Sequence, residues 1–329
     1  MKTPVMQAVR TDGGAVEVDE VRRVRPATGE VLVRVGAVAM DRRDGEIGVG
    51  PGPLRPGARG RRTLGRHVAG TVAAPGAGVD GWPLGRPVAV QPETALRRGW
   101  HVPGVEHDGG LADYIVAPAA GLAPLPRDLS LAAGALLPLA ARTHSMLGHA
   151  RLGLGESIGI WGAGSLGGCA IAVARAMGAT PLVVVDPDPV ARTAALDLGA
   201  DVVLDPTDPG LGERVRSLTA GNGLDVVLHA SPDAMVVPQA VDALAPDGRA
   251  VLAGPVSGIG VPERWDGRAL SGPPRTSPGS LSLLAHLAQA GRLRLPVPPE
   301  LPGGLAAAAL AIDHCVREQT PVTPHLVVL

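Results

Sequence analysis

Three glycines near the middle of the chain form the pattern most suited to chemistry. Gly162, Gly164 and Gly167 make up G-x-G-x-x-G within the run IGIWGAGSLGG. In such a pattern the first glycine permits a tight turn, the second lets the backbone approach a pyrophosphate, and the third lets a helix pack closely on a strand. Ser165 and Leu166 lie between these glycines, where the N–H groups and dipole of a following helix favour an anion. The five residues predict a dinucleotide-binding turn.

An acidic residue follows at the distance that ribose recognition requires. Asp186 ends the run PLVVVD, about 20 residues after the glycines. A carboxylate at this place can take both ribose hydroxyls of NAD, and its charge would repel the 2′-phosphate of NADP. Arg192 is near enough in sequence to contact such a 2′-phosphate, which would weaken the discrimination against NADP. We therefore predict that NAD(H) is favoured over NADP(H), with Thr143 as a further candidate cofactor-binding residue.

The elements around this motif alternate between strand and helix. SIGIW, PLVVVD, ADVVLD, LDVVLHAS and GRAVLAG are buried strand patterns, and helical patterns separate them. Such alternation predicts an α/β fold, a Rossmann-type doubly wound parallel sheet covered by helices on both faces. Residues 1–127 read instead as β-rich, with VLVRVGAVAM, HVAGTVAA, RPVAVQP and LADYIVAP as strands. A helix capped by Ser130 follows, helices are expected over 280–291 and 303–317, HLVVL is a terminal strand, and loops are expected over 48–62 and 255–277.

Composition excludes several classes of protein. Of 329 residues, 45% are hydrophobic, and 30 basic against 31 acidic residues leave no field that favours nucleic acid or an anionic membrane. Lys2 is the single lysine, so an arginine here is weak evidence for phosphate binding. Two cysteines are too few for a disulfide framework or a thiolate zinc site. The N-terminus lacks the apolar core of a signal peptide and no apolar run could span a membrane, so a cytoplasmic protein is expected.

The order of these motifs resembles the medium-chain dehydrogenase/reductase superfamily, and most of all its zinc-type polyol, threonine and glucose dehydrogenase branch. GEVLVRVGAVAMDRRDGEI, TLGRHVAGTV, HDGGLADYIVAP, LAAGALLPLAARTH and VVDPDPVARTAALDLGADVVLDP carry the resemblance over nearly the whole chain. It implies a β-rich GroES-like catalytic domain of residues 1–138 and 272–329, discontinuous around a Rossmann domain of residues 139–271. It also implies a homodimer, or a tetramer, that pairs through the segment 261–272.

The departures from this family concern its metal sites. The resemblance places the three catalytic zinc ligands on Asp41, Arg66 and Leu137. Arginine cannot lose its proton to become a ligand, and leucine has no donor atom. The family's four-cysteine structural-zinc lobe is replaced by ETALRRGWHVPG, which has no cysteine. We therefore predict no bound metal at either site, and an Asp41–Arg66 ion pair where the catalytic zinc would lie.

The family's proton relay is also absent. Its serine falls on Arg43 and its relay histidine on Glu46. An arginine aimed at a developing oxyanion can partly replace a Lewis acid, and a histidine can donate a proton. Arg43 and Arg66 together could also hold a carboxylate or phosphate, which would make the small-molecule substrate anionic. The candidate catalytic residues are Asp41, Arg43, Arg66 and His67, with Tyr114 and His144 as more distant candidates whose structural roles weigh against them.

Three functions remain open at the level of sequence. The first is a zinc-independent NAD(P)(H)-dependent oxidoreductase that acts on an activated C=C, an iminium or a carbonyl in specialised biosynthesis. The second is a retired or non-redox member that binds NAD tightly as a structural or regulatory ligand, or for isomerisation or elimination. The third is a zinc dehydrogenase whose ligands have moved to Asp41, His67 and one further residue.

Overall fold

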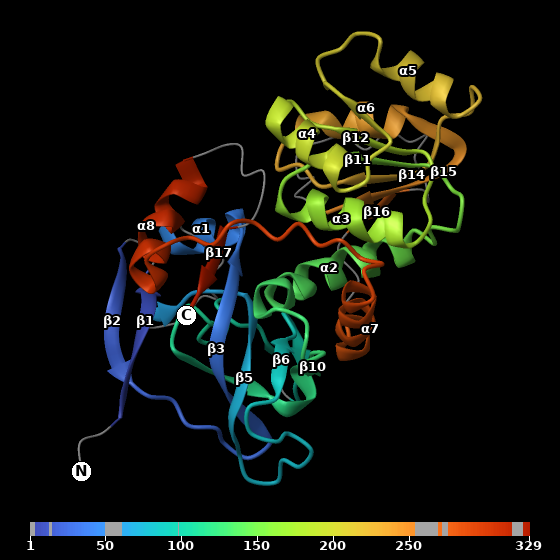
Figure 1. Cartoon of the computed structure of the whole chain (residues 1–329). Coiled ribbons are helices and arrows are strands. Elements are labelled where there is room, and N and C mark those ends of the chain that lie inside the picture. The colour runs from blue at the N-terminus through green and yellow to red at the C-terminus, as the bar shows by residue number, and fades with distance from the viewer. Residues whose placement is uncertain are drawn as a thin grey trace. The chain divides into compact units, whose positions relative to one another are not determined.

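A computed structural model describes residues 4–12, 15–49, 61–97, 99–253, 269–271, 276–317 and 325–329 (Figure 1). The chain divides into two compact units. Unit 1 comprises Met1–Ala141, Thr276–Ala290 and Val297–Leu329, and unit 2 comprises Arg142–Arg275 and Gly291–Pro296. Among the described residues, no helix has the length and apolar character that crossing a membrane requires.

Unit 1 is built from short antiparallel strands, as the β-rich pattern predicts. One sheet has the order β2-β1-β4, a second has the order β10-β6-β5-β3-β17 with β9 also paired to β3, and β7 pairs with β8. The strands are β1 (Val5–Thr11), β2 (Val16–Arg22), β3 (Glu30–Met40), β4 (Arg62–Thr63), β5 (His67–Pro75), β6 (Pro87–Val90), β7 (Thr94–Ala95), β8 (Trp100–His101), β9 (Tyr114–Pro118), β10 (Leu122–Pro124) and β17 (His325–Val328).

The long helix that begins in unit 1 starts at the cap that the sequence predicts. The Ser130 hydroxyl accepts a hydrogen bond from the Ala133 N–H at 3.2 Å, which confirms the predicted N-cap. From Arg142 onward, the residues of the helix that Ser130 caps belong to unit 2. The helices are α1 (Arg42–Val49), the 3-10 turn η1 (Ala119–Gly121), α2 (Leu131–His149), α7 (Pro278–Gln289) and α8 (Gly304–Arg317).

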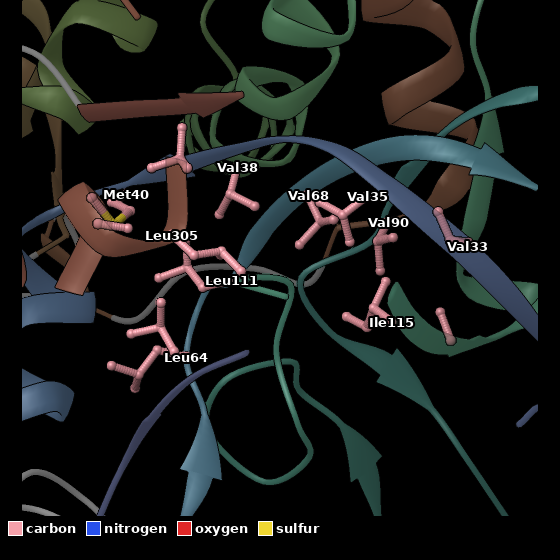
Figure 2. Close-up of a cluster of buried hydrophobic side chains, with 14 of the residues drawn as sticks. Val33, Val35, Val38, Met40, Leu64, Val68, Val90, Leu111, Ile115 and Leu305 are labelled. Atoms are coloured by element: carbon pink, nitrogen blue, oxygen red, sulfur yellow. The ribbon is translucent and has the colours of Figure 1, made fainter. Parts of the chain in front are cut away.

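A bulge in β3 sets which of its side chains enter the core of unit 1. The register against β5 shifts between Val35 and Ala37, where one extra residue is inserted. Side chains alternate along a strand, so this insertion shifts the alternation by one position, and the apolar cluster takes Val33 and Val35 before it and Val38 and Met40 after it. Figure 2 shows these four side chains in one apolar cluster with Leu111 and other labelled residues. The strand therefore remains buried up to Met40, and Asp41 follows directly.

Unit 2 is a doubly wound parallel sheet of the Rossmann type. The strand order is β13-β12-β11-β14-β15-β16, and every neighbouring pair is parallel. This order reverses between β11 and β14, the place where such sheets bind dinucleotides. The elements are β11 (Ile158–Trp161), α3 (Ser165–Ala176), β12 (Leu182–Val185), α4 (Pro189–Asp197), β13 (Val202–Leu204), α5 (Leu211–Leu218), β14 (Leu224–His229), η2 (Ala234–Val236), α6 (Val237–Asp242), β15 (Leu244–Leu252) and β16 (Ala269–Ser271).

Two predicted loops are partly regular. The expected loop 48–62 begins inside α1 and ends in β4, while residues 50–60 lie outside the described part of the chain. The expected loop 255–277 contains β16, which pairs with β15 as the sixth strand of the same sheet. Of the segment 261–272, expected to pair two subunits, only residues 269–271 are described. The dimer therefore stays a prediction.

Candidate functional site

The glycine-rich turn lies between β11 and α3 and has the expected geometry. Gly162 has a φ of +100°, which side-chain-bearing residues rarely adopt, and a Cβ there would lie 2.8 Å from the Ser231 nitrogen. A Cβ on Gly167 would overlap the carbonyl oxygen of Gly162 and lie 2.8 Å from its carbonyl carbon. Gly164 is the N-cap of α3. The tight turn and the close helix–strand packing predicted for the first and third glycines are thus confirmed.

An unpaired hydroxyl lies at the start of α3. Ser165 is the first residue of that helix and is 9% exposed, and its Oγ has no hydrogen-bond partner among the described residues. A buried hydroxyl without a partner costs free energy unless a ligand or water supplies one. Together with the free N–H groups of the helix N-terminus, it fits a phosphate oxygen. The residues present therefore suit the dinucleotide that the motif predicts.

Asp186 ties the end of β12 to this turn. Its Oδ2 accepts a hydrogen bond from the Ala163 N–H at 2.6 Å, and its Oδ1 accepts one from the Asp188 N–H at 2.9 Å. Each carboxylate oxygen keeps a further lone pair for a ligand. The Arg192 guanidinium already has partners. Its Nη1 donates to the Asp186 carbonyl at 2.7 Å and to Asp205 Oδ2 at 3.0 Å, so it is not free to bind a phosphate. Thr143 is fully buried on α2.

The second candidate centre lies in unit 1, at the facing ends of β3 and β5. Ala39 and His67 are register partners, so the residue after β3 and the residue before β5 come together. Arg66 Nη2 donates to Asp41 Oδ1 in a salt bridge. The ion pair predicted from the sequence is therefore confirmed, and both side chains are largely buried.

Asp44 completes this centre, and sequence analysis did not anticipate it. Its side chain is 1% exposed, and its Oδ1 accepts from Arg66 Nε at 3.3 Å. At the start of α1, Asp41 Oδ1 accepts from the Arg43 N–H at 2.9 Å, and Asp44 Oδ2 accepts from the Asp41 N–H at 3.1 Å. This reciprocal arrangement is a capping box, so the spacing D-x-x-D at a helix start was the signal that could have located it. Arg66 thus links both capping carboxylates to β5.

The other candidates divide between this cluster and its surroundings. His67 belongs to it, with Nε2 3.4 Å from Asp41 Oδ2 and a buried Nδ1 that has no hydrogen-bond partner in the described part of the chain. Arg43 contributes its backbone N–H, whereas its side chain is exposed. Tyr114 on β9 makes a cation–π contact instead, because the guanidinium carbon of Arg23 lies 4.0 Å from the centroid of its ring. His144 is half-buried on α2 and belongs to unit 2.

Burial and charge act in opposite directions within the cluster. Burial alone would raise the pKa of Asp41, but Arg66 and His67 hold that pKa well below its ordinary value. Burial raises the pKa of Asp44, and the charge of Asp41 raises it further, against the opposing effect of Arg66. The two carboxylates overcome burial and raise the pKa of Arg66, which stays protonated. The cluster is therefore a fixed cation held between two unequal carboxyl groups.

The comparisons with known proteins cover both units. One family model, described as an alcohol dehydrogenase GroES-like domain, matches residues 27–127, and another, described as a zinc-binding dehydrogenase, matches residues 165–264. L-threonine 3-dehydrogenase of Pyrococcus horikoshii is 34% identical over 256 residues, which cover 74% of this chain and 73% of that protein. D-xylulose reductase of Scheffersomyces stipitis is 33% identical over 221 residues, 59% of this chain and 60% of the other.

The chain belongs to the medium-chain dehydrogenase/reductase superfamily, in its zinc-type alcohol dehydrogenase-like branch. It is a dehydrogenase-type oxidoreductase by family. Solved structures agree in fold: an Escherichia coli protein described as a short chain alcohol dehydrogenase, complexed with NADH, has a TM-score of 0.87 at 20% identity over 99% of both chains. The 2R,3R-butanediol dehydrogenase of Bacillus subtilis has a TM-score of 0.84 at 21% identity, covering 98% of this chain and 99% of the other.

Membership of a zinc-type branch raises the question of whether these residues suit zinc. A guanidinium has no lone pair to offer a metal, and Arg66 already contacts both carboxylates of the cluster. Leu137, on which the resemblance places the third ligand, is fully buried and apolar. A zinc site built from other ligands finds no support in the described part of the chain. No group of three His, Cys, Asp or Glu side chains is placed there to hold a metal. The donor set does not fit the family's zinc.

The segment that replaces the family's structural-zinc lobe contains a stacked histidine pair. His101 on β8 is buried, and its ring centroid lies 4.4 Å from that of the exposed His107. Burial, reinforced by the neighbouring His107, lowers the pKa of His101 to about 4. His101 Nε2 has no hydrogen-bond partner among the described residues. The neutral ring therefore packs here largely as an apolar group.

Acid should destabilise the protein through His101. The ordinary pKa of 6.5 falls to about 4 on folding, so between these values the unfolded chain binds more protons than the folded chain. Stability then falls as the pH falls from 6.5 to 4, by at most about 3 kcal/mol from this group. We expect His101→Leu to flatten the dependence of melting temperature on pH in that window. A His149→Gln control, exposed on α2, should leave it unchanged, and equal slopes for all three proteins would contradict this assignment.

Proposed function

We propose that this chain is a zinc-independent, NAD(H)-linked oxidoreductase that transfers hydride to or from a small polar substrate. The observation that carries the proposal is the Arg66 ion pairs, at positions where the family binds a metal, in a chain that keeps an intact dinucleotide turn. The nicotinamide supplies the hydride chemistry when it is bound, and the protein supplies binding, orientation and charge. The catalytic domain of residues 1–138 and 272–329, the cofactor domain of residues 139–271, a cytoplasmic homodimer and a role in specialised biosynthesis are part of the proposal.

The turn residues would hold the cofactor's phosphates and adenosine ribose. The N–H groups at the start of α3 and the unpaired Ser165 hydroxyl donate toward the pyrophosphate. Asp186 offers its remaining lone pairs to the ribose hydroxyls. Because Arg192 is paired with Asp205, it is poorly placed to neutralise a 2′-phosphate, which supports a preference for NAD(H).

The charge cluster would form the polar wall of the reaction site. Arg66 and His67 orient the Asp41 carboxylate, and the capping box fixes Asp41 to the start of α1. Because Arg66 is held by two carboxylates, it acts in this proposal as a positioning residue for Asp41. Arg43 contributes its backbone N–H to this capping box, and its side chain is exposed on α1.

A titration with reduced cofactors tests the cofactor assignment. We expect cofactor-stripped protein to bind NADH at least about tenfold more tightly than NADPH, because Asp186 repels the 2′-phosphate. Asp186→Asn should weaken NADH binding by about tenfold or more and narrow the preference, since one hydrogen bond to a charged group is worth roughly 1.5–3 kcal/mol. Fluorescence titration measures both constants, with Asp197→Asn, an exposed acid on α4, as the control. Equal affinity for the two cofactors would refute the assignment.

A second function has one observation in its favour. The family's metal ligands and proton relay have been replaced together, which is also what a retired or non-redox member that binds NAD tightly would retain. NAD that stays bound through gel filtration and does not exchange with labelled NAD, in a protein without turnover, would favour this reading. Ready exchange would favour the oxidoreductase.

A further inference from the structure

The cluster at the start of α1 carries more negative than positive groups. Asp41 and Asp44 face the single guanidinium of Arg66, with His67 beside them. The two carboxylates and the guanidinium sum to −1 when both acids are ionised. They sum to zero when Asp44, whose pKa is raised by burial, carries a proton. Counted on these three groups, the place where the family holds a dication is neutral or negative in this chain.

Asp41 is also the member of this cluster with the largest exposed fraction of its side chain. The side chain of Asp41 is 14% exposed, against 8% for Arg66, 3% for His67 and 1% for Asp44. Asp44 and His67 thus lie almost wholly inside. A molecule that reaches the cluster can therefore contact Asp41 and part of Arg66, whereas the Asp44 carboxylate and the His67 ring are closed to it.

Three neighbouring arginines have partners outside this cluster, and Arg43 directs an exposed side chain to solvent. Arg42 pairs with Glu46 at 2.9 Å, and Arg61 pairs with Glu17 at 2.8 Å and with Asp19 at 3.2 Å. Arg62 donates to the Val105 carbonyl. Most guanidinium groups that make the flanking sequence basic therefore have local partners, while Arg55 and Arg59 lie outside the described residues. An anionic substrate held between Arg43 and Arg66 finds little support, because Arg66 is already engaged by two carboxylates.

We propose that the substrate of this site is a cation at its reacting end, an iminium ion, and that the Asp41 carboxylate faces it. This inference rests on the proposed function, because it takes NADH as the reductant. A carboxylate beside a cationic carbon–nitrogen double bond stabilises the bound substrate, whereas it would repel a carboxylate-bearing one. Arg66 and His67 keep that carboxylate ionised and in place.

The same substrate class accounts for the lost metal and the lost relay. An iminium carbon is already electrophilic, so it needs no Lewis acid. The hydride and its electron pair form a C–H bond at that carbon, the π pair of the C=N bond moves to nitrogen, and the nitrogen becomes a neutral amine. NADH becomes NAD⁺, and no proton is taken up in the step. Replacement of the relay positions by Arg43 and Glu46 then removes nothing that this step requires.

Three probes of similar size test the sign of the site. They are N-methyl-1-pyrrolinium, which is permanently cationic, cyclopentanone, which is neutral, and pyruvate, which is anionic. NADH oxidation by the wild-type protein should be fastest with the pyrrolinium ion. The intrinsic reactivity of the iminium carbon contributes to this advantage, and the site's charge contributes roughly 10- to 100-fold in kcat/KM, the range expected for one interaction with a charged group. Failure to reduce the pyrrolinium ion, or reduction no faster than that of the neutral or anionic probe, would overturn the inference.

Two variants locate the effect in the cluster. Asp41→Asn keeps the shape and removes the charge, and it should lower kcat/KM for the pyrrolinium ion by about tenfold or more. Asp44→Asn removes the deeper charge and should lower it by less, because Asp41 remains. Asp80→Asn, an exposed acid in the same unit, should change nothing. If Asp41→Asn does not fold, as judged by circular dichroism, the Asp44→Asn result decides: an unchanged preference for the cation counts against the cluster.

Cofactor binding distinguishes a failure of the proposed function from a failure of the iminium inference alone. NADH affinity is measured on each of these proteins by fluorescence. A protein that binds no NADH contradicts the proposed function itself. A protein that binds NADH and reduces the ketone as well as the iminium retains the proposed function and loses this inference.

Discussion

Replacing Gly167 by alanine should weaken NADH binding by more than about tenfold and lower the free energy of unfolding by roughly 3 kcal/mol, the scale of a forced overlap in a packed interior. The added Cβ would overlap the carbonyl oxygen of Gly162 and lie 2.8 Å from its carbonyl carbon. These are backbone atoms of the turn itself, so either α3 or the turn must shift. The shift would also displace the N–H groups and the Ser165 hydroxyl that we assign to the pyrophosphate.

The next residue provides a matched control. Gly168 lies on the same helix, and a Cβ there would meet Pro296 and Leu198 at ordinary contact distances of 3.5–3.6 Å. Because alanine favours a helix by about 1 kcal/mol over glycine, Gly168→Ala should leave binding unchanged and stability equal or slightly higher. Urea denaturation and NADH titration of both variants measure the two effects. Indistinguishable behaviour of the two variants would show that the close approach at Gly167 does not shape the site.

Arg66→Met should lower the free energy of unfolding by about 3–5 kcal/mol, the cost of leaving a buried charge without its partner. The substitution leaves Asp41 and Asp44 facing each other beside His67. It should also raise the pKa of both carboxyl groups, because the nearby cation no longer favours their ionised forms. Denaturation at several pH values measures this, and the loss should shrink as the pH falls and the carboxyl groups take up protons.

Neutralising the partners should rescue this variant. In Arg66→Met combined with Asp41→Asn and Asp44→Asn, no buried charge is left unpaired, and we expect most of the lost stability to return. Arg42→Met removes a surface pair with Glu46 and serves as the control, with an expected loss below about 1 kcal/mol. If the triple variant were as unstable as Arg66→Met, lost packing of the arginine rather than unpaired charge would explain the result.

The parallel sheet could be predicted because its sequence signals are long and redundant. All four residues of β11 are buried, so the run IGIW is apolar throughout, and the helices that follow each strand supply an independent pattern. β16 was missed because three residues carry no measurable period. β1 and β2 were not singled out either. Charged residues of β2 lie on an exposed hairpin, where the pattern VEVDEVR reads equally well as a solvated segment.

The charge cluster could be predicted in part. The Asp41–Arg66 ion pair was predicted because the family resemblance places both residues at zinc-ligand positions. The structure adds the reason that they meet, since they flank two strands that pair. Asp44 escaped because the run DRRDGE resembles an exposed, mixed-charge helix start, and composition cannot show that one of its acids turns inward. The orphaned hydroxyl of Ser165 was equally invisible, since a missing hydrogen-bond partner is a property of coordinates alone.

Arg66 is paired with two carboxylates, those of Asp41 and Asp44. This pairing bears on the order in which the three residues can have arisen in evolution. An arginine that reached this buried position before an acid was there would have been an unpaired charge, with a penalty of several kcal/mol that few proteins tolerate. An acid at position 41 or 44, by contrast, is useful from the start as a cap for α1. An order in which a helix cap comes first and the cation afterwards avoids this penalty. The reverse order of loss meets the same barrier, because replacing both acids before Arg66 would leave its buried charge unpaired.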